Sequence, residues 1–179
     1  MKTLVVVGHP HLDQSNINKA WVNALRDIEN EDIKLHILSD VVRSDHSFDL
    51  KQEQDLIREY DRIVLQFPLY WYMVPGIMKE WMDTVWAETF AYGEGGIHME
   101  GKLLEIAASC GAPEEAFSEI SLETYLSFLK GSAAFVRAIS GRIFAFYGAE
   151  MPGWEDRLKQ SAAEYKEFIL NVPSELATK

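Results

Sequence analysis

The chain has 179 residues, 47% of them hydrophobic, which is enough to build one sizeable core. Its 17 basic and 28 acidic residues give a formal net charge of -11, which argues against surfaces that bind nucleic acid or an anionic bilayer. The single cysteine, Cys110, cannot form an internal disulfide, and the apolar stretches are too short for membrane insertion. With no secretion signal in the first residues, we expect one cytoplasmic domain over residues 1–172 and a tail over 173–179.

The hydrophobic pattern predicts strands and helices in alternation. The β-branched run at 3–7 predicts a strand buried on both faces, and apolar residues at helical spacing predict a helix over 17–28. The further predicted strands are 33–38, 62–66, 102–109 and 142–147, and the further helices are 50–59, 77–86, a mostly helical stretch 118–139 that Gly131 could break, and 155–170. This alternation predicts a three-layer α/β/α sandwich around a five-stranded parallel sheet of order 2-1-3-4-5.

Ligands of such sheets bind beyond the carboxyl ends of the strands, near the point where the strand order reverses. Three segments would meet there: GHPHLDQSN at 8–16, FPLYWYMVP at 67–75 and SCGAPEEAF at 109–117. These segments are therefore the candidate binding site.

The first segment has a single glycine and is no dinucleotide-binding loop. His9, Ser15 and Asn16 lie instead near a predicted helix N-terminus, where free backbone N–H groups favour a phosphate. In the alternative interpretation Ser15 only caps the helix and His9 is a polar strand end, and Asp13 would repel a phosphate unless it points away. A metal site on His9 and His11 is not expected, because an extended segment projects the two imidazoles to opposite faces.

The second segment places three consecutive aromatic residues, Tyr70, Trp71 and Tyr72, after Pro68 in a predicted loop. One core cannot bury all three, so we expect them to form a wall for a flat conjugated ring. An aromatic dimer interface is the alternative, and the two interpretations are compatible. Cys110, in the third segment, has neither a partner cysteine nor a basic neighbour and is expected to be structural.

With these segments in place, the chain resembles the flavodoxin-like NAD(P)H:quinone oxidoreductases, the family of mammalian quinone reductase and of bacterial ancillary oxidoreductases of potassium efflux. The resemblance spans nearly the whole chain and rests on GHPHLDQSNINKAW, VLQFPLYWYMVPGIMKEWMDTVW, FAYGEGGIHMEGK and FYGAEMPGWEDRLKQSAAEYKEFI. It implies a flavodoxin-like fold and a ping-pong transfer of hydride from NADH or NADPH, through FMN, to a quinone or a similar acceptor. FAD is the alternative cofactor, and FMN is preferred because the short chain has no obvious segment for an adenosine.

The resemblance also implies a set of site residues. The flavin phosphate would be held by His9, Ser15, Asn16, Ile17 and Asn18, the isoalloxazine ring would be lined by Pro68, Leu69, Tyr70, Trp71 and Tyr72, and its pyrimidine side would meet Ser109, Cys110, Gly111 and Ala112. This last set replaces the family's Thr-Thr-Gly-Gly, and Ala112 puts close backbone approach in question.

The resemblance implies a substrate contact for Tyr92, which would reach over the flavin of the second subunit of a homodimer, and we further expect Trp71 and Tyr72 to leave a face for the second substrate. No acid–base residue is carried over, because Phe117 stands near the place of the family's relay tyrosine. Two other functions stay open: a regulatory, ancillary flavoprotein subunit of a potassium-efflux transporter, and a one-electron carrier. The choice between NADH and NADPH, and among quinone, nitro or azo acceptors, also stays open.

Overall fold

The protein is built on one parallel sheet, seen in a computed structural model that describes residues 1–28 and 30–173. Its strand order is β2-β1-β3-β4-β5, which confirms the predicted order. The strands are β1 (Thr3–Val7), β2 (Ile33–Ile37), β3 (Arg62–Pro68), β4 (Leu103–Ser109) and β5 (Ile139–Phe146). All neighbouring strands pair in parallel, so their carboxyl ends share one edge of the sheet.

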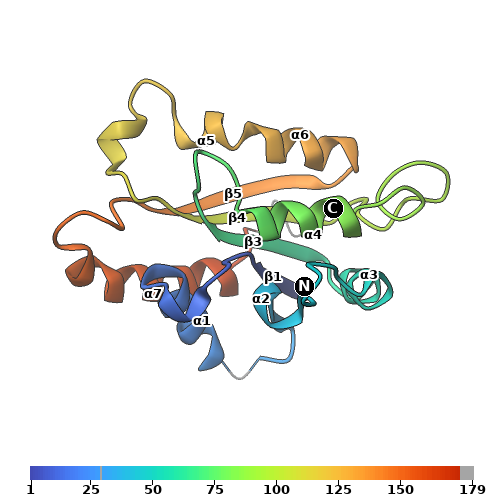
Figure 1. Ribbon diagram of the computed structural model, residues 1–179, viewed down its shortest axis with the longest axis horizontal. Coiled ribbons are helices and arrows are strands. Elements are labelled where there is room, and N and C mark those ends of the chain that lie inside the picture. Colours follow the sequence, from blue (N-terminus) through green and yellow to red (C-terminus); the bar gives the residue numbers. More distant parts are fainter. Residues whose placement is uncertain (29, 174–179) are drawn as a thin grey trace.

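Helices cover both faces of the sheet, as Figure 1 shows. One face carries α1 (Ile17–Arg26) and α7 (Trp154–Leu170), and the other carries α2 (Leu38–Val41), α3 (Leu50–Arg58), α4 (Gly76–Val85), α5 (Leu122–Tyr125) and α6 (Ser127–Phe135). Short 3-10 turns, η1 (Leu12–Gln14) and η2 (Glu114–Phe117), follow β1 and β4. Each side of β1 faces a separate core, which is why its apolar run is continuous.

Several element boundaries differ from the predicted ones. β3 continues to Pro68, which pairs with Ser109 at the end of the sheet, where its missing N–H costs no ladder hydrogen bond. Gly131 lies inside α6, and the helical stretch is instead divided at Leu126. It ends before β5 because Arg137 adopts a left-handed conformation with φ of +59°. The predicted tail lies, apart from residue 173, outside the described residues.

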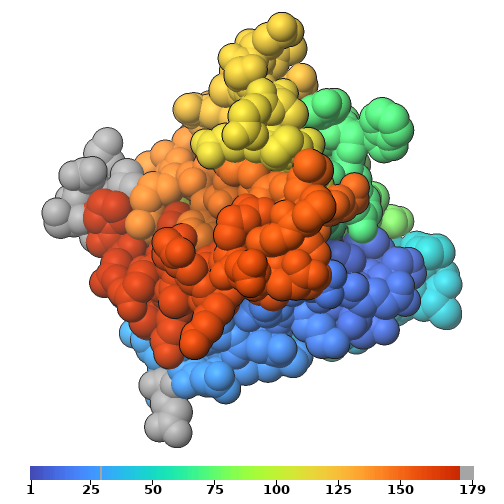
Figure 2. Space-filling view, turned by 90° about the vertical axis from the view of Figure 1, so that its left-hand side faces the viewer, coloured from blue at the N-terminus to red at the C-terminus, as the bar shows by residue number. Residues whose placement is uncertain are grey.

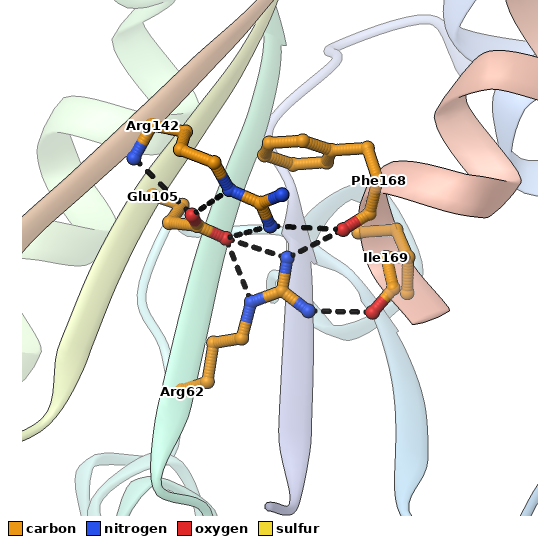
Figure 3. A network of polar contacts seen from close by, with 5 residues as sticks. All are labelled: Arg62, Glu105, Arg142, Phe168 and Ile169. Atoms are coloured by element: carbon orange, nitrogen blue, oxygen red, sulfur yellow. Dashed lines mark hydrogen bonds and ion pairs between the residues drawn. The ribbon is translucent and has the colours of Figure 1, made fainter. Parts of the chain in front are cut away.

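A buried ionic network fastens the end of α7 to three strands (Figure 3). Glu105 on β4 accepts hydrogen bonds from Arg62 Nε at 2.8 Å and from Arg142 Nε at 2.6 Å. The two guanidinium groups also donate to the last carbonyls of α7: Arg62 to Ile169 O at 2.6 Å, and Arg142 to Phe168 O at 3.1 Å. These carbonyls have no hydrogen-bond partner within the helix. The network therefore supplies donors to the last carbonyls of α7 and, at the same time, pairs the buried charges.

Candidate cofactor site

The carboxyl edge of the sheet is the end of the molecule that Figure 2 faces. The segments after β1 (blue), β3 (green), β4 (yellow) and β5 (orange) gather on it. Three of these are the segments that the sequence predicts to form a binding site. The fold therefore brings these three predicted segments to one edge.

The β1–α1 segment presents a helix N-terminus to this edge. Ser15 has extended backbone angles, and its Oγ accepts a hydrogen bond from Asn18 N at 3.1 Å, so Ser15 is the functional cap of α1. Within the described part of the chain, the backbone N–H groups of Asn16, Ile17 and Lys19 donate no hydrogen bond. Three free amides and the Ser15 hydroxyl proton are thus available to an anion.

His9 is buried directly after β1 and keeps its imidazole neutral. Its Nδ1 accepts a hydrogen bond from His11 N at 3.0 Å, which places the ring proton on Nε2. Burial, and secondly the nearby His11, lower the pKa of His9, while Asp13 acts in the opposite direction. His9 therefore serves as an Nε2–H donor. Among the described residues, no group of three or more His, Cys, Asp or Glu side chains is placed to hold a metal ion.

The β3–α4 segment folds into a strained hairpin. Tyr70 and Met73 exchange two backbone hydrogen bonds of 3.0 Å, and the two residues between them, Trp71 and Tyr72, have φ of +48° and +62°. Two consecutive left-handed residues make a type I′ turn, which Asn and Gly normally occupy because a Cβ costs about 1–2 kcal/mol per residue there. Bulky aromatics in such a turn indicate that their exposed rings serve a function.

The aromatics of this hairpin divide into supported and free rings. Tyr72 stacks on Tyr125 with ring centroids 4.2 Å apart, and Tyr70 meets His9 edge-on at 6.5 Å. Trp71 is 94% exposed. One ring is therefore held at the edge as an almost unburied flat surface, consistent with the predicted wall for a conjugated ring.

Replacing Trp71 with asparagine separates strain from function. Asparagine tolerates the left-handed conformation and no buried contact is lost, so we expect the free energy of unfolding to rise by about 1 kcal/mol. FMN binding, measured by fluorescence titration of the apoprotein, should weaken several-fold. Met73→Asn is the matched control, because Met73 is also exposed but lacks a positive φ. Unchanged stability and unchanged FMN affinity would show Trp71 to be an ordinary surface residue.

The segment after β4 is tied to the β5–α7 loop. Cys110 donates its N–H to Phe146 O at 2.7 Å, and its buried thiol has a pKa raised to about 12 by desolvation, so it offers the edge no free backbone N–H and no thiolate. Gly111 and Ala112 donate no backbone hydrogen bond within the described chain. A Cβ on Gly111 would lie 2.9 Å from Glu150 Cδ, whereas Ala112 has no positive φ and is unstrained. Alanine at 112 thus leaves its N–H accessible.

Four side chains that the sequence analysis did not connect lie beneath this edge. Asn18, Gln66 and Ser109 form one hydrogen-bonded chain with Tyr165 of α7, and all four are buried. Asn18 and Ser109 were predicted as flavin contacts. Gln66 and Tyr165 were missed, although a glutamine at the end of an otherwise apolar strand was a signal for a buried polar partner.

Tyr92 lies far from this edge in its own chain. It belongs to the loop between α4 and β4, at the opposite end of the sheet (Figure 1), and its ring is 5.2 Å from that of Phe135. Both line a hollow of about 520 Å³ between α4 and α6. Trp86 also lines it, and its buried Nε1 has no hydrogen-bond partner among the described residues.

Losing the Ser15 hydroxyl should weaken FMN binding more than riboflavin binding, because only FMN carries a phosphate. In Ser15→Ala we expect the ratio of FMN affinity to riboflavin affinity to fall about tenfold. The free energy of unfolding should also fall by about 1 kcal/mol, because the helix cap is lost. Ser121→Ala is the control, since Ser121 Oγ caps α5 through Thr124 N at the same 3.1 Å. An unchanged ratio would reduce Ser15 to a helix cap.

Comparison with known proteins agrees with this geometry. A family described as having a flavodoxin-like fold matches residues 1–169. The chain belongs to this family. Among flavodoxin-like relatives, the uncharacterized NAD(P)H oxidoreductase YdeQ of Bacillus subtilis is 35% identical over 96% of this chain and 88% of its own. The potassium-efflux ancillary protein KefG of Enterobacter sp. is 33% identical over 69% of this chain and 66% of its own.

Solved structures extend the match. General stress protein 14 of Treponema denticola, in complex with FMN, has a TM-score of 0.86, with 29% identity over 94% of this chain and 98% of its own. An NADPH-quinone reductase from P. pentosaceus has a TM-score of 0.83, with 30% identity over 97% and 100%. A structure named as a tryptophan halogenase from Streptomycin violaceusniger scores 0.89, with 34% identity over 95% and 99%. Since these names differ in chemistry, the activity must be argued from the site.

Proposed function

We propose that the protein is an FMN-dependent NAD(P)H:quinone oxidoreductase. The observation that carries this proposal is the strained hairpin with its exposed Trp71, placed at the same edge as the free N–H groups of α1. A flat surface and a phosphate site on one edge are what FMN requires. Bound FMN would supply the hydride chemistry that links a nicotinamide nucleotide to an acceptor in the same pocket.

The donor set fits FMN from end to end. His9, Ser15 and the N–H groups of Asn16, Ile17 and Lys19 would hold its phosphate, Pro68 to Tyr72 its ring, and the Ser109 hydroxyl with the N–H groups of Gly111 and Ala112 its pyrimidine side. Asn18, predicted as a phosphate contact, instead donates its N–H to Ser15 Oγ and its Nδ2 to Ser109 Oγ. Relatives support the assignment, since the Treponema structure contains FMN and two relatives are named NAD(P)H or NADPH oxidoreductases. The chain itself orients nucleotide and acceptor and supplies fixed donors where negative charge develops.

The test is anaerobic addition of NADH or NADPH to the FMN-loaded protein, followed by a soluble quinone. We expect the yellow flavin absorbance to disappear with at least one nucleotide and to return with the quinone. Flavin that stays oxidised with both nucleotides would exclude the enzymatic function.

We further propose a homodimer formed through the hollow between α4 and α6. Trp86 Nε1 is a buried donor without an acceptor among the described residues, which a second copy would supply, and Phe135 at the rim is 65% exposed. Tyr92 lies too far from its own hairpin to contact substrate there, so its predicted role requires a second copy. A two-fold arrangement would place each Tyr92 at the site of the other chain.

A regulatory role is the second candidate function, favoured by the similarity to KefG. In that case flavin and nucleotide occupancy would control a potassium-efflux transporter. Co-purification with such a transporter that depends on bound nucleotide would support it.

Among the described residues no helix is long and apolar enough to cross a membrane. We place the protein in the cytoplasm, where its single buried cysteine stays reduced and nicotinamide nucleotides are available.

A further inference from the structure

A buried chain of hydrogen bonds leads from α7 to the candidate flavin site. Tyr165 OH lies 2.8 Å from Gln66 Oε1, Gln66 Nε2 lies 3.3 Å from Asn18 Oδ1, and Asn18 Nδ2 lies 2.9 Å from Ser109 Oγ. The four residues come from four different elements, α7, β3, α1 and β4. The chain ends at Ser109, the last residue of β4, which is 6% exposed at the carboxyl edge.

The direction of these bonds is fixed by the backbone. Gln66 Nε2 also donates to the backbone carbonyl of Asn18 at 3.1 Å, and a carbonyl can only accept, so the Gln66 amide cannot be flipped. Its Oε1 therefore faces Tyr165, whose burial raises the pKa of the phenol and keeps the hydroxyl protonated as a donor. Asn18 must then turn Oδ1 toward Gln66 and Nδ2 toward Ser109.

This order determines what Ser109 can do. Its Oγ accepts from Asn18, so its own proton must be donated to another group. Within the described chain the Ser109 hydroxyl donates to no acceptor, and the residue faces the edge beside Pro68, its partner in the sheet. The proton is thus directed toward the site where the ligand binds.

We propose that Tyr165, Gln66 and Asn18 are positioning residues that present the Ser109 hydroxyl proton to the pyrimidine edge of the bound flavin. This inference rests on the proposed function and adds to it a way of setting the flavin's reduction potential. A fixed donor at that edge stabilises the negative charge that accumulates there on reduction. Its loss should lower the affinity of reduced FMN more than that of oxidised FMN.

The experiment is a double-mutant cycle on the FMN-loaded protein, with the FMN dissociation constant and the midpoint potential as readouts. Ser109→Ala should weaken the binding of reduced FMN about tenfold more than that of oxidised FMN, which corresponds to a potential about 30 mV more negative for a two-electron couple. Ser109→Thr keeps the hydroxyl and should restore the potential. In the wild-type background, Tyr165→Phe should weaken the binding of reduced FMN about threefold more than that of oxidised FMN. In the Ser109→Ala background it should cause no such difference.

Ser161→Ala is the matched control. It removes another buried hydrogen bond of α7, that from Trp21 Nε1 to Ser161 Oγ at 3.1 Å. Trp21 stacks on Tyr165, but Ser161→Ala leaves every hydrogen bond of the chain to Ser109 in place. It should lower stability and leave the potential unchanged. An equal effect of Tyr165→Phe in both backgrounds would assign Tyr165 a purely structural role, and an unchanged potential in Ser109→Ala would overturn the proposal. Both outcomes presuppose wild-type protein that binds FMN, so a failure of the proposed function is seen separately. If Tyr165→Phe does not fold, the alanine and threonine variants of Ser109 still test whether the Ser109 hydroxyl sets the potential.

Discussion

Replacing Glu105 with alanine is expected to lower the free energy of unfolding by about 3–5 kcal/mol, the cost of breaking a fully buried ion pair by removing one partner. The carboxylate is completely buried between Arg62 and Arg142, and without it the buried guanidinium group of Arg62 faces that of the partly exposed Arg142 with no negative charge between them. Urea denaturation followed by circular dichroism measures the change. The control is Asp83→Ala, whose pair with Lys79 is exposed and should contribute less than about 1 kcal/mol. Equal losses in the two variants would contradict a stabilising network.

The same carboxylate makes stability depend on pH. Burial acts to raise the pKa of Glu105, but the hydrogen bonds from Arg142 and the charge of Arg62 outweigh it and hold the pKa below its usual value. Because the folded state binds the proton more weakly than the unfolded state, the stabilisation is complete above about pH 4.3 and is lost as the pH falls below it. In Glu105→Gln this part of the acid-induced loss should be absent.

Mixing two impaired variants is expected to restore activity if the sites are shared between chains. Trp71→Ala and Tyr92→Ala should each lower kcat/KM for the acceptor about tenfold, through the loss of an aromatic contact. In a mixed dimer, one site combines an intact hairpin with an intact Tyr92 from the other chain. The other site lacks both.

Random exchange of subunits should therefore recover about a quarter of the wild-type activity, well above either variant alone. Subunits are exchanged by dilution and reconcentration, and the dimer is checked by analytical ultracentrifugation. Tyr92→Phe is the control, since it retains the ring and should need no complementation. A mixture no more active than the average of its components would contradict shared sites, and a monomeric wild type would contradict the dimer itself.

Much of the architecture could be predicted from local pattern. The buried run of β1 and the alternation of strands with helices were sufficient to predict the strand order. The position of the three polar or aromatic segments after their strands was sufficient to predict that they meet at the carboxyl edge of the sheet. The hairpin conformation was not predictable, because Trp71 and Tyr72 contradict the residue preferences of its turn. The proposed contact of these rings with the flavin accounts for this departure from local preference.

The partners of the buried polar groups could not be predicted from local pattern either. Arg62 and Gln66 lie within a strand that reads as apolar, and each finds its partner far along the chain, Gln66 in Tyr165 99 residues later. Periodicity carries no information on such pairs. β5 begins at Ile139, earlier than predicted, and Gly141 within it lies so close to Glu105 that a Cβ would lie 2.4 Å from Glu105 Cγ.

The network at the end of α7 bears on how the chain completes its fold during synthesis. Arg62 needs the carbonyls of Phe168 and Ile169, which are translated more than 100 residues later. In a nascent chain that has emerged only through β5, Arg62 and Arg142 still lack the carbonyl acceptors at the end of α7. The sheet face that α1 and α7 cover is then also without α7. Nearly the entire protein must therefore leave the ribosome before the fold is complete. A chain truncated before α7 should be degraded by proteases and should not fold into a smaller domain.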